Sequence, residues 1–372
     1  VSASCVFIGL GIFALAVFWI RKCRQSSGLP KHEYSALKTD GDNEKLRAER
    51  QIRNGAFMSC KQNLEDNERY ELKTQLEDIG SRPEKHWFIV QDNTLGAERL
   101  LALIPLPSTC PLTPSRSTRD ALIELFRGLQ HPYVHPVLDV EFWRGEVAVI
   151  SPVNPAGSLK DLIYGASWFE DYEKKYRARG EGLSVRTIQC LGRQIIEGLI
   201  FLRNRYFPPI YHLHSGNVII QNGVARLAGL ENPLLGVSSH ACAHACVTSA
   251  HVCPAPAALA FGRLLFEMAT GREPPPGAPT LALLRLGLER GEPRVAEALE
   301  FIFREGGAPS LEELARCELF RGVELRELRG ASVIQSTSTP EVMELLETVK
   351  NHVPQLPSRR LHYSDDLEPW FA

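Results

Sequence analysis

The sequence predicts an α+β fold, in which a small β-rich part is followed by a larger helical part and preceded by one transmembrane helix. Runs with strand character are concentrated between residues 70 and 150, whereas apolar residues recur at helical spacing after residue 158. The 372 residues, 44% of them hydrophobic, are enough to bury a sizeable core. A formal net charge of −2 provides no overall field that would recruit nucleic acid. The nine cysteines are scattered along the chain, which is typical of reduced thiols rather than of a disulfide scaffold.

Residues 1–20 are expected to be a membrane anchor. They contain no charged side chain and match the roughly 20 residues that a membrane-spanning helix needs. Arg21, Lys22 and Arg24 follow directly, and basic flanks stay in the cytoplasm, so we expect a single-pass protein whose remaining chain is cytoplasmic. A signal peptide, which carries its basic residues before the apolar run, and a buried helix are the alternatives. The polar residues 21–62 are predicted to be a juxtamembrane linker.

The β-rich part is predicted to contain a hairpin, a helix and a further strand. Residues 86–91 and 99–104 are rich in β-branched, aromatic and other apolar residues and flank a short polar turn, which indicates a hairpin. Residues 117–129 place leucines and a phenylalanine at helical spacing. The run 146–150 is predicted to be another strand. A small sheet that encloses one helix is therefore expected.

The helical part begins with a capping pattern. Ser158 is predicted to be the N-cap of a helix over 159–164, with Asp161 in the third helical position. A longer helix is predicted to follow, because one of its faces is apolar throughout. The prolines that begin at Pro208 end this helix. That face consists of Ile188, Leu191, Ile195, Leu199 and Leu202.

A second hairpin interrupts the helices. Asn222 and Gly223 stand between two short apolar runs, and Asn-Gly is a strong signal for a type I′ turn. An apolar helix over 257–270 follows, and further helices are predicted from 280 to about residue 328.

Four motifs occur in the order and at the spacing of the protein-kinase fold. They are Leu-Gln-His-Pro-Tyr-Val at 129–134, the run ending Gly-Ser-Leu at 150–159, Phe-Gly-Arg-Leu-Leu-Phe-Glu-Met at 261–268 and Ala-Pro-Ser-Leu-Glu-Glu-Leu at 308–314. Each motif is weak alone, but together they resemble the bilobal protein-kinase family. The resemblance implies a kinase-like domain over 63–330 with a β-rich N-lobe and a helical C-lobe, followed by a C-terminal tail over 331–372.

Two further segments resemble a narrower group. His-Leu-His-Ser-Gly-Asn-Val at 212–218 and Leu-Glu-Asn-Pro-Leu-Leu-Gly at 230–236 are similar to the slowpoke-binding proteins and to the related PX-domain-containing kinase-like proteins. This resemblance implies a regulator of slowpoke, a calcium-activated potassium channel, that also binds 14-3-3 proteins.

The residues that phosphoryl transfer requires are largely replaced. A kinase needs a lysine paired with a glutamate, a catalytic aspartate, and an asparagine and an aspartate that bind Mg²⁺. By the spacing of the family, Ile104 and Leu122 occupy the lysine and glutamate slots, His212 replaces the catalytic aspartate, and Gly229 replaces the metal-binding aspartate. Asn217 alone keeps the expected residue type.

We therefore predict a pseudokinase without catalytic residues or cofactor, which acts as a scaffold. Residues 79–85 contain one glycine instead of the glycine-rich loop, in agreement with this hypothesis. One alternative is an unusual active Ser/Thr kinase that uses His212 as its base and Glu231 as a displaced metal ligand. The other is a metal-responsive adaptor, although the ligand spacing matches no familiar zinc site. Its candidate ligands are His240, Cys242, His244 and Cys246.

Overall fold

The computed structural model describes residues 40–76, 79, 85–178, 180–210, 213–237, 256–274, 292–304, 307–329 and 339–352. The chain divides into two compact units, residues 1–55 and residues 56–372. Helix α2 (Asp40–Leu64) begins in the first unit and ends in the second. The strands and the remaining described helices all belong to the second unit.

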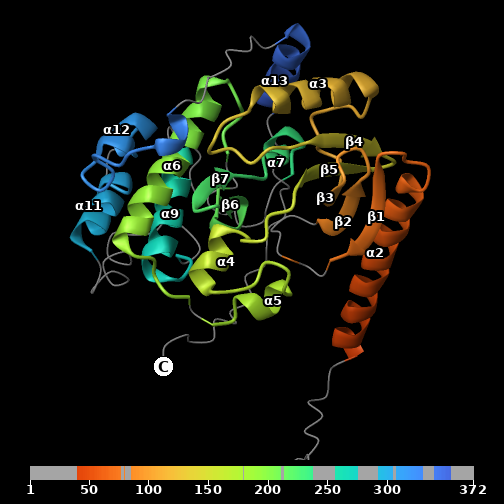
Figure 1. Ribbon diagram of the computed structural model, residues 1–372, viewed down its shortest axis with the longest axis horizontal. Helices are drawn as coiled ribbons and strands as arrows, with labels where there is room; N and C mark the ends of the chain where they lie inside the picture. The colour runs from red at the N-terminus through yellow and green to blue at the C-terminus, as the bar shows by residue number, and fades with distance from the viewer. Residues whose placement is uncertain are drawn as a thin grey trace, which may run out of the picture. The chain divides into compact units, whose positions relative to one another are not determined.

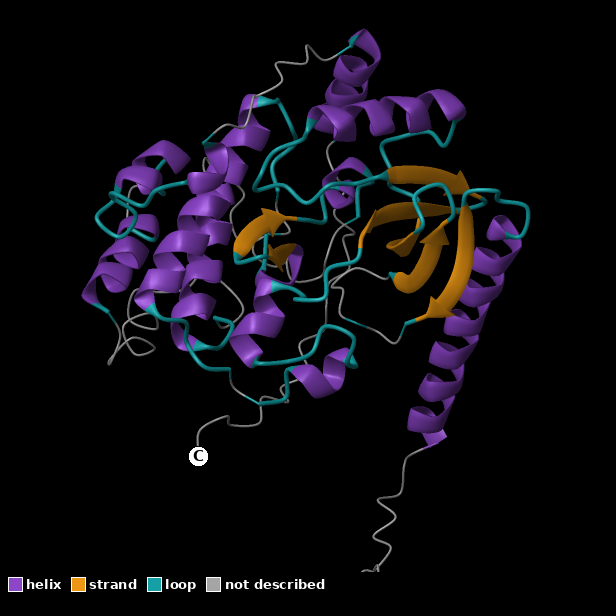
Figure 2. Ribbon diagram, in the orientation of Figure 1, coloured by secondary structure: helices purple, strands orange, loops and turns teal. Residues whose placement is uncertain are grey.

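A five-stranded antiparallel sheet forms the first part of the second unit (Figures 1 and 2). The strand order is β1-β2-β3-β5-β4, so that β3 is central and pairs with both β2 and β5. The strands are β1 (Tyr70–Gln75), β2 (His86–Asp92), β3 (Ala97–Pro105), β4 (Asp139–Trp143) and β5 (Glu146–Pro152). The predicted hairpin of β2 with β3 and the predicted strand β5 are thus confirmed.

The two faces of the sheet contribute to different cores. Side chains alternate between the faces of a strand, so Leu101 and Leu103 of β3 point to one face and Ala102 and Ile104 to the other. The first pair belongs to a small hydrophobic cluster that contains Ala56, Cys60 and Leu64 of α2. The second pair belongs to the main core, which also includes the helices that follow.

Residues 56–64 of α2 cover the first face. Ala56, Cys60 and Leu64 are spaced by four residues and therefore form one buried stripe along the helix. Burial raises the pKa of the Cys60 thiol to about 12, so this cysteine is an inert part of the core. The sequence predicts only a polar linker here, because the apolar stripe consists of three residues and the rest of the helix is polar.

Helix α3 (Arg116–Gly128), predicted over residues 117–129, packs against β4, and its buried residues belong to the main core. Ser115 is its N-cap and accepts a hydrogen bond from the backbone N–H of Thr118. Its buried face consists of Ala121, Leu122, Leu125 and Phe126. We call the sheet, residues 56–64 and α3 the sheet lobe.

The elements from α4 to α12 form the helical lobe. Its longer helices are α6 (Val185–Asn204), α9 (Pro256–Thr270) and α11 (Pro293–Ile302), and its shorter ones are α4 (Leu159–Tyr164), α5 (Tyr172–Lys175), α7 (Glu231–Leu234), α12 (Leu311–Arg316) and the 3₁₀ turns Ser215–Asn217 and Arg326–Leu328. Strands β6 (Val218–Gln221) and β7 (Val224–Leu227) pair as the predicted hairpin. Asn222 and Gly223 have φ values of 53° and 76°, as a type I′ turn requires.

The last described helix, α13 (Pro340–Asn351), lies in the segment predicted to be a tail. It contacts α3 and α7, and Figure 1 shows it in blue beside α3. Val342, Leu345, Leu346 and Val349 are its buried residues. The chain thus returns from the helical lobe to the outer side of α3.

The prediction of a transmembrane helix is corrected. Within the described ranges, no helix is both long and apolar enough to cross a membrane. The 25-residue α2 is long enough but is rich in charged residues, and the apolar α9 has only 15 residues against the roughly 20 that a span needs. Residues 1–20, on which the prediction rested, lie outside the described residues. The structure therefore does not support the expected single-pass membrane localisation or a membrane contact through this segment.

Candidate functional site

The kinase-like cleft lies between the sheet lobe and the helical lobe, and its ion-pair slots are apolar. Ile104 on β3 has no exposed surface, and Leu122 on α3 is 2% exposed. Both belong to the main hydrophobic core, and Ile104 pairs with Val147 across the sheet. Replacing both members of a buried ion pair by apolar side chains avoids an uncompensated charge, which replacing one member would leave.

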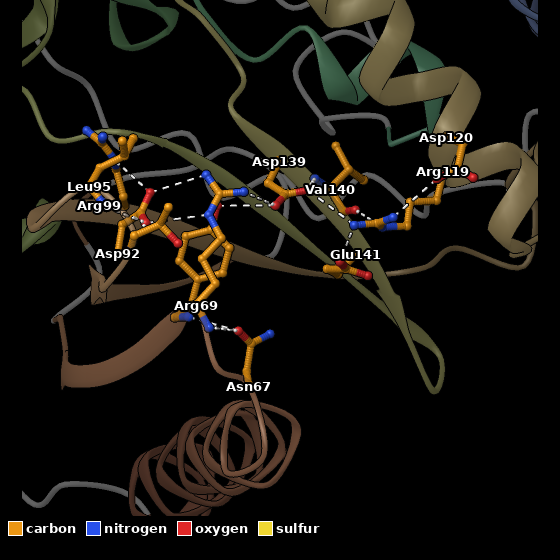
Figure 3. Close-up of polar contacts among 12 residues, drawn as sticks. Asn67, Arg69, Asp92, Leu95, Arg99, Arg119, Asp120, Asp139, Val140 and Glu141 are labelled. Atoms are coloured by element: carbon orange, nitrogen blue, oxygen red, sulfur yellow. Dashed lines mark hydrogen bonds and ion pairs between the residues drawn. The ribbon is translucent and has the colours of Figure 1, made fainter.

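A polar network at the edge of the sheet fixes α3 instead (Figure 3). The guanidinium of Arg119 on α3 pairs with Glu141 on β4, with Nη2 and Oε1 2.6 Å apart. Its Nε donates a hydrogen bond of 3.1 Å to the carbonyl of Val140. The same guanidinium lies 3.6 Å from Asp139. The charged attachment of this helix is therefore to β4, away from the slots that catalysis would use.

The network continues across the sheet to the turn between β2 and β3. Arg69 joins Asp139 and Asp92, with ion-pair distances of 3.1 and 3.2 Å (Figure 3). The side chain of Asp92 is fully buried, and its carboxylate also accepts hydrogen bonds from the backbone of Thr94 and Leu95. Burial acts to raise the pKa of Asp92, but the hydrogen bond and charge of Arg69 outweigh it and hold this pKa below its usual range.

In the helical lobe, the two residues at the predicted metal-binding positions, Asn217 and Gly229, lie against each other. Gly229 has a φ of +73°, and a Cβ added to it would lie 2.9 Å from Nδ2 of Asn217 and 3.0 Å from Nδ2 of Asn232. An aspartate at this position would therefore have to adopt a left-handed backbone and to displace the amide group of the asparagine that is predicted to share the metal ion. The local packing is built around a residue without a side chain.

Glu231, the alternative metal ligand, is engaged in an ion pair. Nζ of Lys85, directly before β2, lies 2.5 Å from its Oε1. The two side chains are 4% and 10% exposed. The carboxylate that an active kinase would need for Mg²⁺ is thus held by a lysine of the opposite lobe.

A small cavity remains where the cleft approaches the start of α4. Its volume is about 100 Å³, below the roughly 300 Å³ at which typical small-molecule pockets begin. Residues of both lobes line it, among them Trp87, Leu100, Pro152, Trp168, Tyr172 and Tyr176. The last three come from the connection between α4 and α6, which therefore forms one wall.

Asp161 anchors this connection. Its carboxylate caps Ser158 as predicted, and it also accepts a hydrogen bond of 2.7 Å from the hydroxyl of Tyr176 and pairs with Lys175 at 3.0 Å. Burial acts to raise the pKa of Asp161, but the hydrogen bonds from Ser158 and Tyr176 and the charge of Lys175 together lower it. Burial and the bond to Asp161 raise the pKa of Tyr176. The carboxylate is ionised and fully engaged inside the protein.

A second buried lysine stabilises the same wall. Nζ of Lys160 on α4 lies 2.6 Å from Glu273 and faces the rings of Tyr164, Tyr172 and Tyr176, with 4.5 to 5.7 Å to their centroids. Such cation–π contacts are strongest where the cation is desolvated. Burial acts to lower the pKa of Lys160, but Glu273 outweighs it and raises this pKa. The tyrosines of the connection are therefore held around a cation of the lobe itself.

The structure places four of the five predicted slot residues. Asn217 and Gly229 are brought together, Ile104 and Leu122 both belong to the main core, and His212 lies outside the described residues. The candidate metal ligands His240, Cys242, His244 and Cys246 also lie outside them. Among the residues that are described, no group of three or more His, Cys, Asp or Glu side chains is arranged to hold a metal ion.

Sequence reasoning missed the lysines that fill the cleft. Lys85 and Lys175 stand in charged stretches, which are typical of solvated surface. The length of the connection over 165–184 is the feature of the sequence that could have indicated additional structure near Lys175. The contacts of these lysines are with residues far along the chain, and no local pattern indicates them.

This chain resembles a kinase-like protein of two lobes in its fold and in its cleft. It is a relative of slowpoke-binding protein from Drosophila melanogaster, with 42% identity over 340 residues, which cover 86% of this chain and 66% of that protein. It is also 33% identical over 213 residues to the mouse PX domain-containing protein kinase-like protein, covering 55% of this chain and 36% of that protein. The resemblance inferred from the motifs is confirmed.

A third relative bears on catalysis. The chain is 28% identical over 304 residues to the probable inactive serine/threonine-protein kinase slob2 of Dictyostelium discoideum, covering 78% of this chain and half of that protein. No family model matches the chain. The chain spans less than two thirds of the length of each of these relatives. The comparison supports the expectation of a non-enzymatic pseudokinase.

Proposed function

We propose that this chain is a catalytically inactive kinase-like protein that works by binding protein partners. The observation that carries the proposal is the packing at Gly229, where the amide groups of Asn217 and Asn232 lie so close that an aspartate would have to displace them. The apolar pair of Ile104 and Leu122 supports it, because the α- and β-phosphates of ATP would lose their lysine. Loss of a single electrostatic contributor already lowers turnover by about 10²- to 10³-fold.

The first test measures nucleotide binding and turnover with the full chain. A ligand present at a hundred times its Kd stabilises the native state by about 2.7 kcal/mol, which a thermal-shift assay detects. We expect no shift with millimolar ATP and Mg²⁺ and no phosphoryl transfer to itself or to a generic substrate protein. A Mg²⁺-dependent shift together with turnover would favour the alternative of an unusual active kinase.

A pair of glycine variants tests the observation at Gly229. Gly96 also has a positive φ, of +63°, but nothing lies within 4 Å of an added Cβ, so Gly96→Asp is the matched control. Both variants introduce backbone strain, whereas only Gly229→Asp adds a collision. We expect Gly229→Asp to lower the free energy of unfolding by about 2 kcal/mol more than the control does. Equal stability of the two variants, with Mg²⁺ binding gained in Gly229→Asp, would contradict the proposal.

The relationship to slowpoke-binding protein supports a more specific proposal for the partner. We propose that the chain binds the slowpoke calcium-activated potassium channel and modulates it, and that a 14-3-3 protein is a second partner. Co-precipitation of the full chain with the purified channel, and separately with 14-3-3, tests each partner. Binding that survives removal of ATP and Mg²⁺ is expected of a scaffold. Absence of binding to either protein would leave the kinase-like scaffold without these partners.

A further inference from the structure

Two buried lysines, one in each lobe, each contact an acceptor group of the other lobe. We infer that these two contacts hold the cleft closed from within the chain, and we call them the cross-cleft contacts. One joins Lys85 of the sheet lobe to Glu231 of the helical lobe. The other joins Lys175 of the helical lobe to the carbonyl of Ile79, in the connection between β1 and β2. The inference goes beyond the proposed function, because a scaffold would function with an open or a closed cleft.

The first contact is an ion pair withdrawn from water. Its Nζ and Oε1 atoms are 2.5 Å apart, and the side chains are 4% and 10% exposed. Each charge is therefore compensated by its partner and not by water. Nζ of Lys85 also lies 5.8 Å from the ring centroid of Trp87, which lines the cavity. Separation of the lobes would break this ion pair. Each of the two charges would then have to be hydrated or remain buried without its partner.

The second contact belongs to a fully satisfied ammonium group. Nζ of Lys175 has three donors, and it lies 3.0 Å from Asp161, 2.9 Å from the carbonyl of Trp168 and 3.0 Å from the carbonyl of Ile79. Its side chain is 1% exposed. Two of these acceptors belong to the helical lobe, so the third bond is the one that crosses the cleft.

The positions of the two contacts explain why they act together. Ile79 lies in the connection between β1 and β2, and Lys85 lies where that connection meets β2. In a kinase this connection is the loop that covers the phosphates. Here two of its residues contact the helical lobe, Ile79 through its carbonyl as an acceptor and Lys85 through its ammonium group as a donor. Opening the cleft therefore requires both contacts to break, which restricts access to the cavity.

Hydrogen–deuterium exchange of the full chain tests the inference. In Lys85→Met and in Lys175→Met we expect about tenfold faster exchange in peptides from both sides of the cleft, 86–92 and 218–235, because a hydrogen bond to a charged group is lost. In the double variant the two fold-changes should multiply in the same peptides, since both contacts oppose one opening motion. Glu231→Gln combined with Lys85→Met should add little to Lys85→Met alone, because both changes remove one contact.

The exposed pair of Lys73 and Glu71 on β1 provides the matched control. Its ion-pair distance is 3.0 Å, and the side chains are 40% and 58% exposed, so Lys73→Met should leave exchange in both peptides unchanged. Faster exchange confined to the peptide next to each substituted lysine would overturn the inference.

If Lys85→Met does not fold, the charge exchange Lys85→Glu with Glu231→Lys provides a second test, because it restores the ion pair. We expect this double variant to restore protection from exchange, and its failure to do so would equally overturn the inference. Nucleotide binding is measured separately, so an ATP-binding but closed protein would contradict only the proposed function.

Discussion

The charged residues of the sheet lobe differ sharply between its cleft side and its edge. On the cleft side, Ile104 and Leu122, at the predicted positions of an ion pair, are packed into the core. At the edge, Arg69, Asp92 and Arg119 take part in a connected network that ties β2, β4 and α3 together (Figure 3). Helix α3 is therefore fixed to the sheet by charges on its β4 side and not at the predicted ion-pair positions.

The largest expected effect comes from returning a charge to the cleft side. Ile104→Lys should lower the free energy of unfolding by about 3–5 kcal/mol, because the ammonium would be buried without a partner. Urea denaturation measures the change, with Leu95→Lys as the control, since Leu95 is 64% exposed. Addition of Leu122→Glu should recover part of the loss if the two slots face each other. An Ile104→Lys variant as stable as the control would show that the slot is open to water.

A smaller effect is expected from breaking the edge network. Asp92→Asn keeps the shape of the side chain but removes the charge that Arg69 contacts, and should cost about 2 kcal/mol. The folded-state pKa of Asp92 is lowered, so its contribution is present above the unfolded value of about 3.9 and is lost as the pH falls through the folded value. Urea denaturation at pH 7 and below pH 4 measures both effects. If the variant is still less stable than the wild type below the folded-state pKa of Asp92, the lost stability does not come from the charge of this residue.

The cleft and the edge should also lose stability in different pH ranges. Burial, followed by the charge of Arg226, lowers the pKa of His135 on the cavity wall to about 4, although Glu231 acts in the opposite direction. The unfolded chain then binds more protons between about pH 6.5 and 4, so stability falls as the pH falls through this range.

The expected loss through His135 is about 2 kcal/mol between pH 7 and pH 5, which is smaller than a single buried-charge defect. Urea denaturation across this range measures it, and His135→Asn should flatten the profile while Asp92→Asn should not. Equal slopes for wild type and His135→Asn would show that another group titrates in this range.

Local patterns in the sequence predicted the elements of the two lobes well. The strands β2, β3 and β5, helix α3, the capping box at Ser158 and the Asn222-Gly223 turn all depend on residues a few positions apart. The packed helix at residues 56–64 and helix α13 were missed, because each presents a narrow apolar stripe within a polar segment. The transmembrane helix was predicted from the apolar run at 1–20 and the basic residues after it, and it is not supported by the structure.

The sequence by itself determined which charged residues are absent from the kinase-like slots. Ile104, Leu122 and Gly229 were found by counting from nearby motifs, and counting suffices because slot positions follow the order of the chain. Only the tertiary structure decided which charges fill the cleft. Lys85 and Glu231 are 146 residues apart, and Lys175 and Ile79 are 96 apart. A buried lysine finds its partner through the folding of both lobes, and no periodicity or local spacing records such a pairing.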